Sequence, residues 1–381
     1  MKKLFSLLLV VAMLATSVSV FVACGEQGTG KICLITDVGT IDDKSFNQGA
    51  WEGVKAYAKA NKLAESDIKY IKPYAASDAD YLDAIDLAVA WGARTIVTPG
   101  FLFEVPIFEA QTRYPDVKFI LLDGAPHTLD YSTFRTDKNV ASVTYAEEEV
   151  GYLAGYAAVK DGFTDLGFLG GMSVPAVVAF GYGYLKGADD AAKELNITVD
   201  IQHSYLGNFG SEAVKNAAAA TTMFQNADVI FACAGGAGMQ VMDVAGKLTD
   251  KWVIGVDVDQ YNTGAGKTCI TSATKGLAKS VQDILTSIRD GKFDIYGGKT
   301  TVFNAKVDGI GLPIADLNAD TAKVGQFKTF TVGDYKAIYA KLVAGTVKDL
   351  ARTVKSAADL PTAEEIKTGL KLTNVILTVV K

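Results

Sequence analysis

The stretch DVGTIDDKSFNQGAWEG, residues 37–53, links an apolar run at 32–36 to a segment with the apolar spacing of an amphipathic helix. The loop between them is rich in carboxylates. In an open parallel α/β sheet, small molecules bind in the crevice outside the carboxyl ends of the strands. The position of these residues therefore predicts a ligand-binding loop at the end of the first strand.

Short apolar runs alternate with helical patterns along most of the chain, which indicates parallel sheets flanked by helices. Up to Tyr145 the pattern predicts strands at 31–36, 68–72, 95–98, 118–122 and 140–143, and helices around 46–59, 81–91 and 105–114. Beyond Tyr145 it predicts strands at 166–169, 198–202, 229–232 and 253–256, and helices near 147–160, 176–195, 211–224 and 239–248. The chain is therefore expected to form two α/β lobes of similar construction.

The first residues have the pattern of an export signal. Lys2 and Lys3 precede an apolar run at 4–14, and small residues lead to Ala23 and Cys24. The run is too short for a membrane span of about 20 residues. Two interpretations stay open: a lipoprotein signal, 1–23, in which Cys24 is lipidated, or a cleaved secretory peptide with an incidental cysteine. Residues 24–30 are expected to form a flexible tether.

Composition and charge limit the size of the protein's cores and the classes of partner it can bind. The 381 residues, 49% of them hydrophobic, supply enough apolar material for two cores of ordinary size. The formal charge is −6, and loss of the leader with its two lysines makes it −8. Nucleic acids and anionic lipids require clustered Lys and Arg, so neither is an expected partner.

The sequence offers little for catalysis, metal binding or disulfide formation. Cys33, Cys233 and Cys269 lie in apolar runs without paired spacing, so we expect buried, unreactive thiols. His127 and His203 are the only histidines, and neither lies in a catalytic or metal-binding local pattern. We therefore expect no enzyme, no metal and no cofactor.

Several stretches resemble the basic membrane protein family of bacterial solute-binding lipoproteins, whose best understood branch comprises the purine nucleoside receptors of ABC importers. They are the opening loop and the segments 114–124, 151–156 and 255–257. The resemblance implies a type I periplasmic-binding-protein fold, in which two doubly wound parallel-sheet lobes are joined by a hinge of several crossings. It also implies a monomeric protein whose partners are a nucleoside ligand and an importer permease. The expected location is the outer face of the cell membrane, or the periplasmic side in a two-membrane envelope.

The same resemblance sets the expected lobe boundaries. The first lobe is expected to comprise 31–144 and 273–298, and the second 145–272 and 299–381. A helix at 275–290 would belong to the first lobe, and a crossing near 301–303 would return the chain to the second. Residues 332–342 and 363–370 have helical patterns, with no assigned place in the fold.

Aspartates and glycines stand where the predicted strands end. Asp37 and Asp123 follow strands of the first lobe, and Gly235 and Asp257 follow strands of the second. Carboxylates suit ligands rich in hydroxyl and N–H donors, while glycines let a ligand approach the backbone. The alternative for Asp123 and Asp257 is ordinary helix capping. Asp42, Asp43 and Ser45 are also residue types that cap helices.

The resemblance assigns further residues to the pocket. Asp37 and Asn47 occupy family positions that contact ligand. Phe209 matches an aromatic that stacks on the base, unless it is a core residue. The opposing ring is absent from the first loop, where Thr40 and Ile41 stand. Two alternatives stay open: Phe46 or Phe101 substitutes for it, or the ligand face there is aliphatic. Lys275, in a Thr-Ser-x-x-Lys element, would pair with Asp257 to bind ribose hydroxyls, the alternative being a solvated surface lysine.

Together these features predict a hinged receptor that captures a nucleoside between its lobes and delivers it to an ABC importer, and the resemblance implies a purine nucleoside. Two alternatives stay open. The cleft carboxylates could serve an enzyme that hydrolyses or phosphorolyses nucleosides. A lipid-anchored sensor could use the same binding mechanics.

Overall fold

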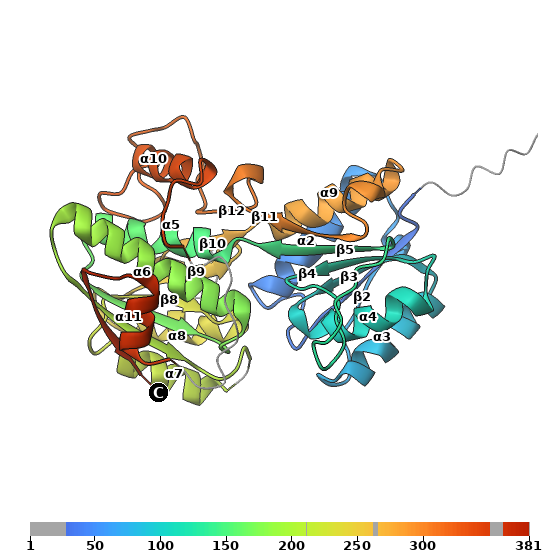
Figure 1. Cartoon of the computed structure of the whole chain (residues 1–381), viewed down its shortest axis with the longest axis horizontal. Helices are drawn as coiled ribbons and strands as arrows, with labels where there is room; N and C mark the ends of the chain where they lie inside the picture. Colours follow the sequence, from blue (N-terminus) through green and yellow to red (C-terminus); the bar gives the residue numbers. More distant parts are fainter. Residues whose placement is uncertain (1–27, 211, 262–265, 351–360, 381) are drawn as a thin grey trace, which may run out of the picture.

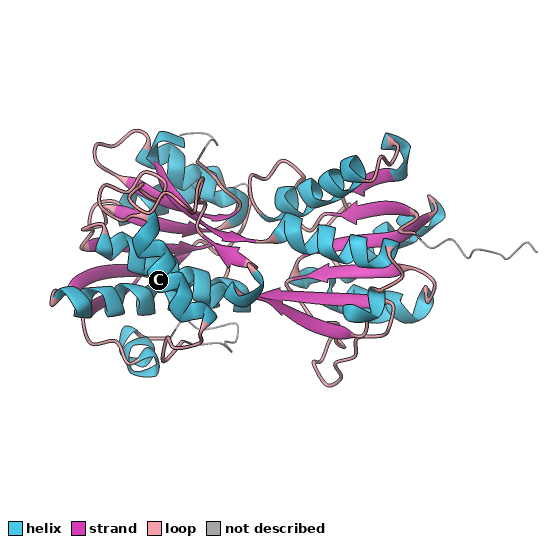
Figure 2. Cartoon of the chain, turned by 90° about the horizontal axis from the view of Figure 1, so that it is seen from above, coloured by secondary structure: helices cyan, strands magenta, loops and turns pink. Residues whose placement is uncertain are grey.

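The computed structural model describes residues 28–210, 212–261, 266–350 and 361–380. The expected leader, Cys24 and the start of the tether lie outside the described residues. The described chain forms two α/β lobes side by side along the long axis of the molecule (Figure 1). Their sheets carry helices on both faces (Figure 2).

The first lobe contains a six-stranded parallel sheet in the order β11-β5-β4-β3-β1-β2. Its strands are β1 (Lys31–Ile35), β2 (Ile68–Ile71), β3 (Ala93–Pro99), β4 (Lys118–Leu122), β5 (Val140–Tyr145) and β11 (Lys299–Phe303). Its helices are α2 (Phe46–Ala60), α3 (Asp78–Ala90), α4 (Glu104–Arg113) and α9 (Leu277–Arg289). Helices α2 and α9 pack together on one face of the sheet, and α3 and α4 cover the other (Figure 1).

The second lobe contains a seven-stranded sheet in the order β12-β10-β9-β8-β6-β7-β13, parallel except for β12. Its strands are β6 (Asp165–Gly170), β7 (Val199–Tyr205), β8 (Val229–Cys233), β9 (Trp252–Asp257), β10 (Cys269–Lys275), β12 (Ile310–Gly311) and β13 (Val375–Val379). Its helices are α5 (Glu147–Lys160), α6 (Pro175–Leu195), α7 (Ala213–Met223), α8 (Gly238–Ala245), α10 (Val332–Val343) and α11 (Ala363–Leu370).

Short 3₁₀ turns complete the described elements: Glu65–Asp67, Phe101–Phe103, Gly235–Ala237, Gly266–Thr268, Phe293–Ile295 and Ala305–Val307. The central strands are buried on both faces, and every residue of β8 is buried. This burial explains why these strands appear in the sequence as continuous apolar runs rather than alternating ones. No helix within the described residues combines the length and apolar character needed to cross a bilayer.

The described chain crosses between the lobes three times. The first crossing joins β5 to α5 through Ala146, the second joins β10 to α9 through Gly276, and the third runs from β11 to β12. Because β5 leads directly into the second lobe, the carboxyl ends of the first sheet face that lobe. The two-lobed fold and its multiple-crossing hinge are as predicted from the sequence.

Two of the expected lobe boundaries are wrong in detail. The expected break at 272/273 falls inside β10, all of which belongs to the second sheet. Residues 299–303, expected in the second lobe, form β11 and pair with β5 at the edge of the first sheet. An apolar run predicts a strand, but it does not show which sheet edge the strand joins, because the pairing residues are far apart in sequence.

Helices α5 and α6 approach each other unusually closely beneath the hinge. A Cβ atom on Gly155 would lie 2.0 Å from the carbonyl oxygen of Tyr184, and one on Gly187 would lie 2.0 Å from that of Tyr152. Only glycine fits at such contacts. The pair fixes α5, whose first turn enters the site described next.

Candidate ligand-binding site

The opening loop is held by the first turn of α2. Asn47 Nδ2 donates to Asp37 Oδ1 at 2.7 Å and to Asp43 Oδ2 at 2.8 Å. Asp43 also accepts from the backbone N–H groups of Ser45, Asn47 and Gln48, and so satisfies the free amides that begin the helix. Asp43 is therefore the capping residue, as the capping interpretation predicted, whereas Asp37 and Asn47 shape the loop.

Asp37 carries an unusually basic carboxylate. Its burial raises its pKa to about 6, although hydrogen bonds from the Gly39 backbone and the Asn47 side chain act in the opposite direction. Its backbone N–H donates to Asn47 Oδ1 at 3.1 Å. This double link between β1 and α2 fixes the end of the first strand.

Lys275, the last residue of β10, lies at the centre of a charged cluster between the lobes. Its side chain is only 2% exposed, which rules out a solvated surface lysine. Its ammonium contacts Asp123 Oδ2 from the first lobe and Glu147 Oε1, at 3.0 Å, from the start of α5. The lysine therefore connects a first-lobe carboxylate with a second-lobe carboxylate.

Three aromatic rings surround the same ammonium. Its nitrogen lies 5.1 Å from the centre of the Phe46 ring, 5.4 Å from Tyr145 and 5.2 Å from Phe180. Rings at this distance attract a cation through their negative faces. Burial alone would lower the pKa of Lys275, but the charges of Asp123, Glu147 and Asp257 raise it well above its ordinary value.

Asp257 ends β9 and faces the first lobe. Its Oδ2 accepts a hydrogen bond from Ser45 Oγ across the interlobe junction. Nearby, Gln260 Nε2 donates to the carbonyl oxygen of Lys44 at 2.7 Å. Burial raises the pKa of Asp257 to about 6, while the Lys275 charge and the Ser45 bond lower it. The expected direct pairing of Asp257 with Lys275 is thus corrected: the ion pairs of Lys275 are with Asp123 and Glu147.

Neither Asp123 nor Asp257 caps a helix. β4 is followed by a loop and β5, and the described residues directly after β9, 258–261, are not helical. Both residues have left-handed backbones, with φ of 58° and 67°. Asp123 Oδ1 is buried and has no hydrogen-bond partner among the described residues. A buried carboxylate oxygen without a donor is costly, and a ligand hydroxyl would satisfy it.

Phe209 and Gly235 lie together on the second-lobe side. The half-buried Phe209 ring packs against Gly171, where a Cβ would come within 2.3 Å of the ring, and its Cδ1 lies 3.6 Å from a Cβ placed on Gly235. A Cβ placed on the neighbouring Gly236 would lie 3.9 Å from the Asp43 carbonyl oxygen of the first lobe. Phe209 is therefore a half-buried residue of the second-lobe surface rather than a deep core residue.

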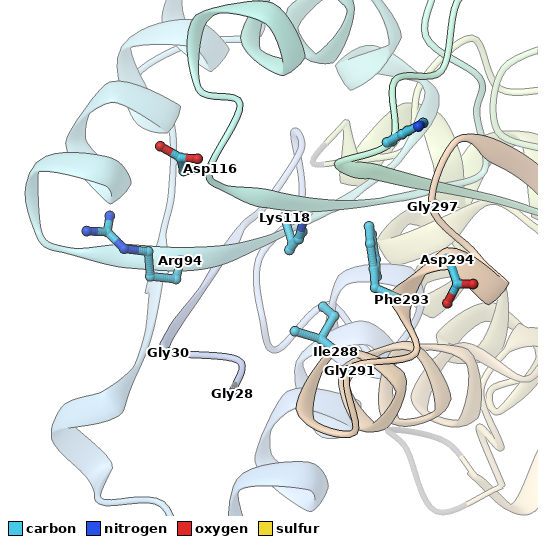
Figure 3. Close-up of a pocket in the computed structure, with 11 residues that line it drawn as sticks. Gly28, Gly30, Arg94, Asp116, Lys118, Ile288, Gly291, Phe293, Asp294 and Gly297 are labelled. Carbon is cyan, nitrogen blue, oxygen red and sulfur yellow. The ribbon is translucent and has the colours of Figure 1, made fainter. Parts of the chain in front are cut away.

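Two cavities differ in their relation to this cluster. A hollow of about 270 Å³ is lined by Asp257 and Lys275 together with residues of α2 and α9. A larger cavity of about 790 Å³ lies at the opposite, amino edge of the first sheet, where Lys118 and Phe293 line it (Figure 3). None of the predicted site residues lines the larger cavity, so the interlobe cluster is the candidate site.

The sequence reasoning missed Glu147, Tyr145 and Phe180 as members of the cluster. Glu147 begins a run of three glutamates that looked like an ordinary acidic first turn of a helix. All three are buried, which is unusual for that role. The signal available in the sequence was an acidic triplet directly after a predicted lobe crossing.

Comparison with proteins of known sequence gives consistent relatives. The chain is 34% identical over 308 residues, 76% of this chain and 83% of the relative, to a protein of Lactococcus lactis subsp. cremoris named ABC transporter nucleoside-binding protein BmpA. It is 30% identical over 367 residues, 88% of this chain and 98% of the relative, to the CD4+ T-cell-stimulating antigen of Listeria monocytogenes.

Solved structures agree on the fold. An ABC transporter solute-binding protein from Aeropyrum pernix K1 superposes with a TM-score of 0.69 at 24% identity, covering 90% of this chain and 99% of that one. A second, from Conexibacter woesei, has a TM-score of 0.66 at 23% identity and covers 85% of this chain and 100% of that one. At these identities the likeness shows the type I binding-protein architecture alone.

The family comparison confirms the resemblance that the loop motifs indicated. The matching model is described as Bmp, ABC transporter substrate-binding protein PnrA-like, and it covers residues 31–337, from β1 into α10. The matched range includes both sheets' central strands and every residue of the interlobe cluster. The chain therefore belongs to the Bmp family of PnrA-like ABC transporter substrate-binding proteins.

Proposed function

We propose that this protein captures a nucleoside, with purine nucleosides preferred, in the cleft between its lobes and delivers it to an ABC importer. The observation that carries the proposal is the buried cluster in which Asp123 of the first lobe meets Lys275 of the second, with Asp257 at the end of the adjacent strand. The name of the Lactococcus relative gives independent support for the nucleoside.

The chemistry of the cluster suits a ribose. A carboxylate accepts hydrogen bonds and an ammonium donates them, so Asp123, Asp257 and Lys275 can satisfy neighbouring hydroxyl groups. Phe209 or Phe46 would supply a stacking surface for the base, a contact that contributes about 1 to 3 kcal/mol per base. Gly235 would let the ligand approach the wall of the cleft closely. Asn47 would fix the loop that carries Asp37.

Binding would act through closure of the hinge. A ligand shifts the equilibrium between open and closed arrangements only by its differential affinity for them. A nucleoside that contacts Asp123 and Asp257 at once gains contacts from both lobes only when the cleft is shut. Closure also removes the ligand from water, which strengthens each hydrogen bond. The closed surface would then be recognised by the permease.

The protein would work outside the cytoplasmic membrane as a monomer anchored through a lipid on Cys24. It would need no cofactor and perform no catalysis. The runner-up functions, a nucleoside-cleaving enzyme and a sensor, share the same cleft. Incubation with nucleosides followed by chromatography separates the enzyme from the receptor, because a receptor returns its ligand unchanged.

A thermal-shift screen of the domain from residue 25 onward tests the proposal. Purine nucleosides, pyrimidine nucleosides, free bases and pentoses would be compared at equal concentration. We expect the largest rise in melting temperature with a nucleoside, since a ligand that binds only the native state stabilises it by mass action. No shift with any nucleoside, or a larger shift with a pentose alone, would overturn the proposal.

A further inference from the structure

Glu147 holds a distinctive place at the hinge. It is the first residue of α5, immediately after the first lobe crossing, and it is 7% exposed. Its partner Lys275 is the last residue of β10, immediately before the second crossing. Their contact, 3.0 Å from Oε1 to Nζ, therefore ties two crossings of the hinge together.

The two ion pairs of Lys275 respond differently to movement of the lobes. Lys275 and Glu147 both belong to the second lobe and lie beside the pivot, so an opening rotation leaves them together. Asp123 belongs to the first lobe, so opening carries it away from the ammonium. The same asymmetry applies to Asp257. On opening it stays in the second lobe with Lys275, but it loses the hydrogen bond from Ser45 of the first lobe.

We propose that Glu147 is a positioning residue that holds the Lys275 ammonium in the cleft in both arrangements, and that it takes up a proton when the cleft closes. This inference rests on the proposed function, in which Lys275 contacts the ligand. In the closed arrangement, three carboxyl groups act on one ammonium: Glu147 and Asp257 are buried, and the Asp123 side chain is 11% exposed. An excess of buried negative charge is costly, and a proton on one carboxyl removes it.

Glu147 is the member of the cluster suited to carry that proton near neutral pH. Burial raises its pKa to about 8; the Lys275 charge lowers it and the Asp123 charge raises it. The pKa of Asp257 is raised only to about 6. The other titratable groups facing the cluster, the Tyr145 hydroxyl and the Cys233 thiol, have pKa values raised by burial and remain neutral.

The sign of the effect follows from linkage. Opening takes the Asp123 charge away from Glu147 and leaves the Lys275 charge beside it, so the pKa of Glu147 falls toward the ordinary glutamate value near 4.3, and closure binds a proton at pH values between that figure and about 8. Closure, and with it ligand affinity, is therefore most favourable on the acid side of this window. It weakens as the pH rises through 8 and becomes independent of pH beyond it.

Calorimetry on the full domain tests the inference directly. The probe is whichever of adenosine, guanosine, inosine, cytidine and uridine gives the largest thermal shift. Titrations in two buffers of different ionisation enthalpy count the protons taken up on binding. We expect nearly one proton at pH 7, about half a proton at pH 8 and almost none at pH 9. Affinity should fall about tenfold between pH 7 and pH 9.

Matched variants assign the effect. Glu147→Gln keeps the size and hydrogen-bonding groups of the side chain, and should abolish proton uptake and the pH dependence of affinity. Glu149→Gln is the control: Glu149 is also buried in the same turn, but its Oε2 accepts from the Ala305 backbone at 2.9 Å. This variant should retain the wild-type pH profile. Unchanged pH dependence in Glu147→Gln would overturn the inference.

Carbon-13 NMR separates this inference from the proposed function. In the nucleoside-bound domain one glutamate carboxyl should titrate near pH 8 and be missing from Glu147→Gln, whereas in the ligand-free domain the same carboxyl should titrate at lower pH. If no nucleoside shifts the melting temperature, the proposed function fails and this inference fails with it. If nucleosides bind and no carboxyl titrates near pH 8 in the complex, the inference fails and the receptor function stands.

Discussion

Lys275 is buried among three aromatic rings and two carboxylates, an arrangement that a solvated or merely structural lysine does not require. Isolated buried charges are costly, and they persist where they are paired and hydrogen-bonded. Replacing a buried ion pair by apolar groups is often neutral, so the pair itself is weak evidence for a role in stability. Its position at the junction of two lobes points instead to recognition.

Replacement of Asp257 tests the second-lobe half of the site. Asp257→Ala should weaken nucleoside binding by about 1 to 3 kcal/mol, because ribose hydroxyls would lose an acceptor in a buried setting. Titration calorimetry measures the change, with circular dichroism as the check on folding. Wild-type affinity in a folded variant would remove Asp257 from the site.

Replacement of Lys275 tests the cluster as a whole. Lys275→Met leaves Asp123 and Glu147 without their cation, and loss of one partner of a buried pair costs about 3 to 5 kcal/mol. Urea denaturation should show this loss in the free energy of unfolding. The control is Lys279→Met, which removes an exposed pair with Asp283 and should change stability by no more than about 0.5 kcal/mol. Equal losses of unfolding free energy in the two variants would contradict the burial of the Lys275 ion pairs.

At the scale of single residues, sequence could identify acceptors but not their partners. Asp37 and Asp123 follow first-lobe strands, as expected, and Asn47 lies in the first turn of α2. Lys275, expected to begin a helix, is instead the last residue of β10. The sequence could not show that Lys275 pairs with Asp123 and Glu147 rather than Asp257. Which carboxylate a lysine reaches depends on side-chain directions at adjacent strands, and these are set only by the packed fold.

At the scale of elements, most strands and helices begin and end within a few residues of the predicted bounds, because continuous apolar runs and helical spacing leave a strong pattern. β10, β12 and β13 were not predicted as strands, and β11 was assigned to the wrong lobe. β11 and β13 are edge strands, exposed at several positions, and their sequences carry less of that pattern. Their pairing depends on long-range contacts that local sequence does not encode.

The contact between α5 and α6 gives a prediction at this scale. Gly155→Ala should destabilise the domain by about 1 to 3 kcal/mol, since a methyl group cannot fit 2.0 Å from a carbonyl oxygen without separating the helices. Gly369→Ala, in α11, is the matched control because a Cβ there meets no atom within 4 Å. Thermal melts of both variants measure the difference. A stable Gly155→Ala protein would mean that the helices can separate freely.

At the scale of the whole molecule, two lobes bring together residues that are distant in sequence, and the cleft exists only in the assembled fold. Ser45 and Asp257 are 212 residues apart, and Lys275 and Asp123 are 152 apart. In the proposed function, contacts of this kind would make ligand binding and lobe closure a single event. The fold class was predictable from the repeated strand-helix rhythm, whereas the partners across the cleft were not.

A crystal structure of the domain with its preferred nucleoside would show whether both lobes hold the ligand. We expect the ribose hydroxyls to contact Asp123, Asp257 and Lys275 between closed lobes, with the base against Phe209 or Phe46. A nucleoside bound in the cavity at the amino edge of the first sheet, or bound to one lobe alone, would contradict this expectation.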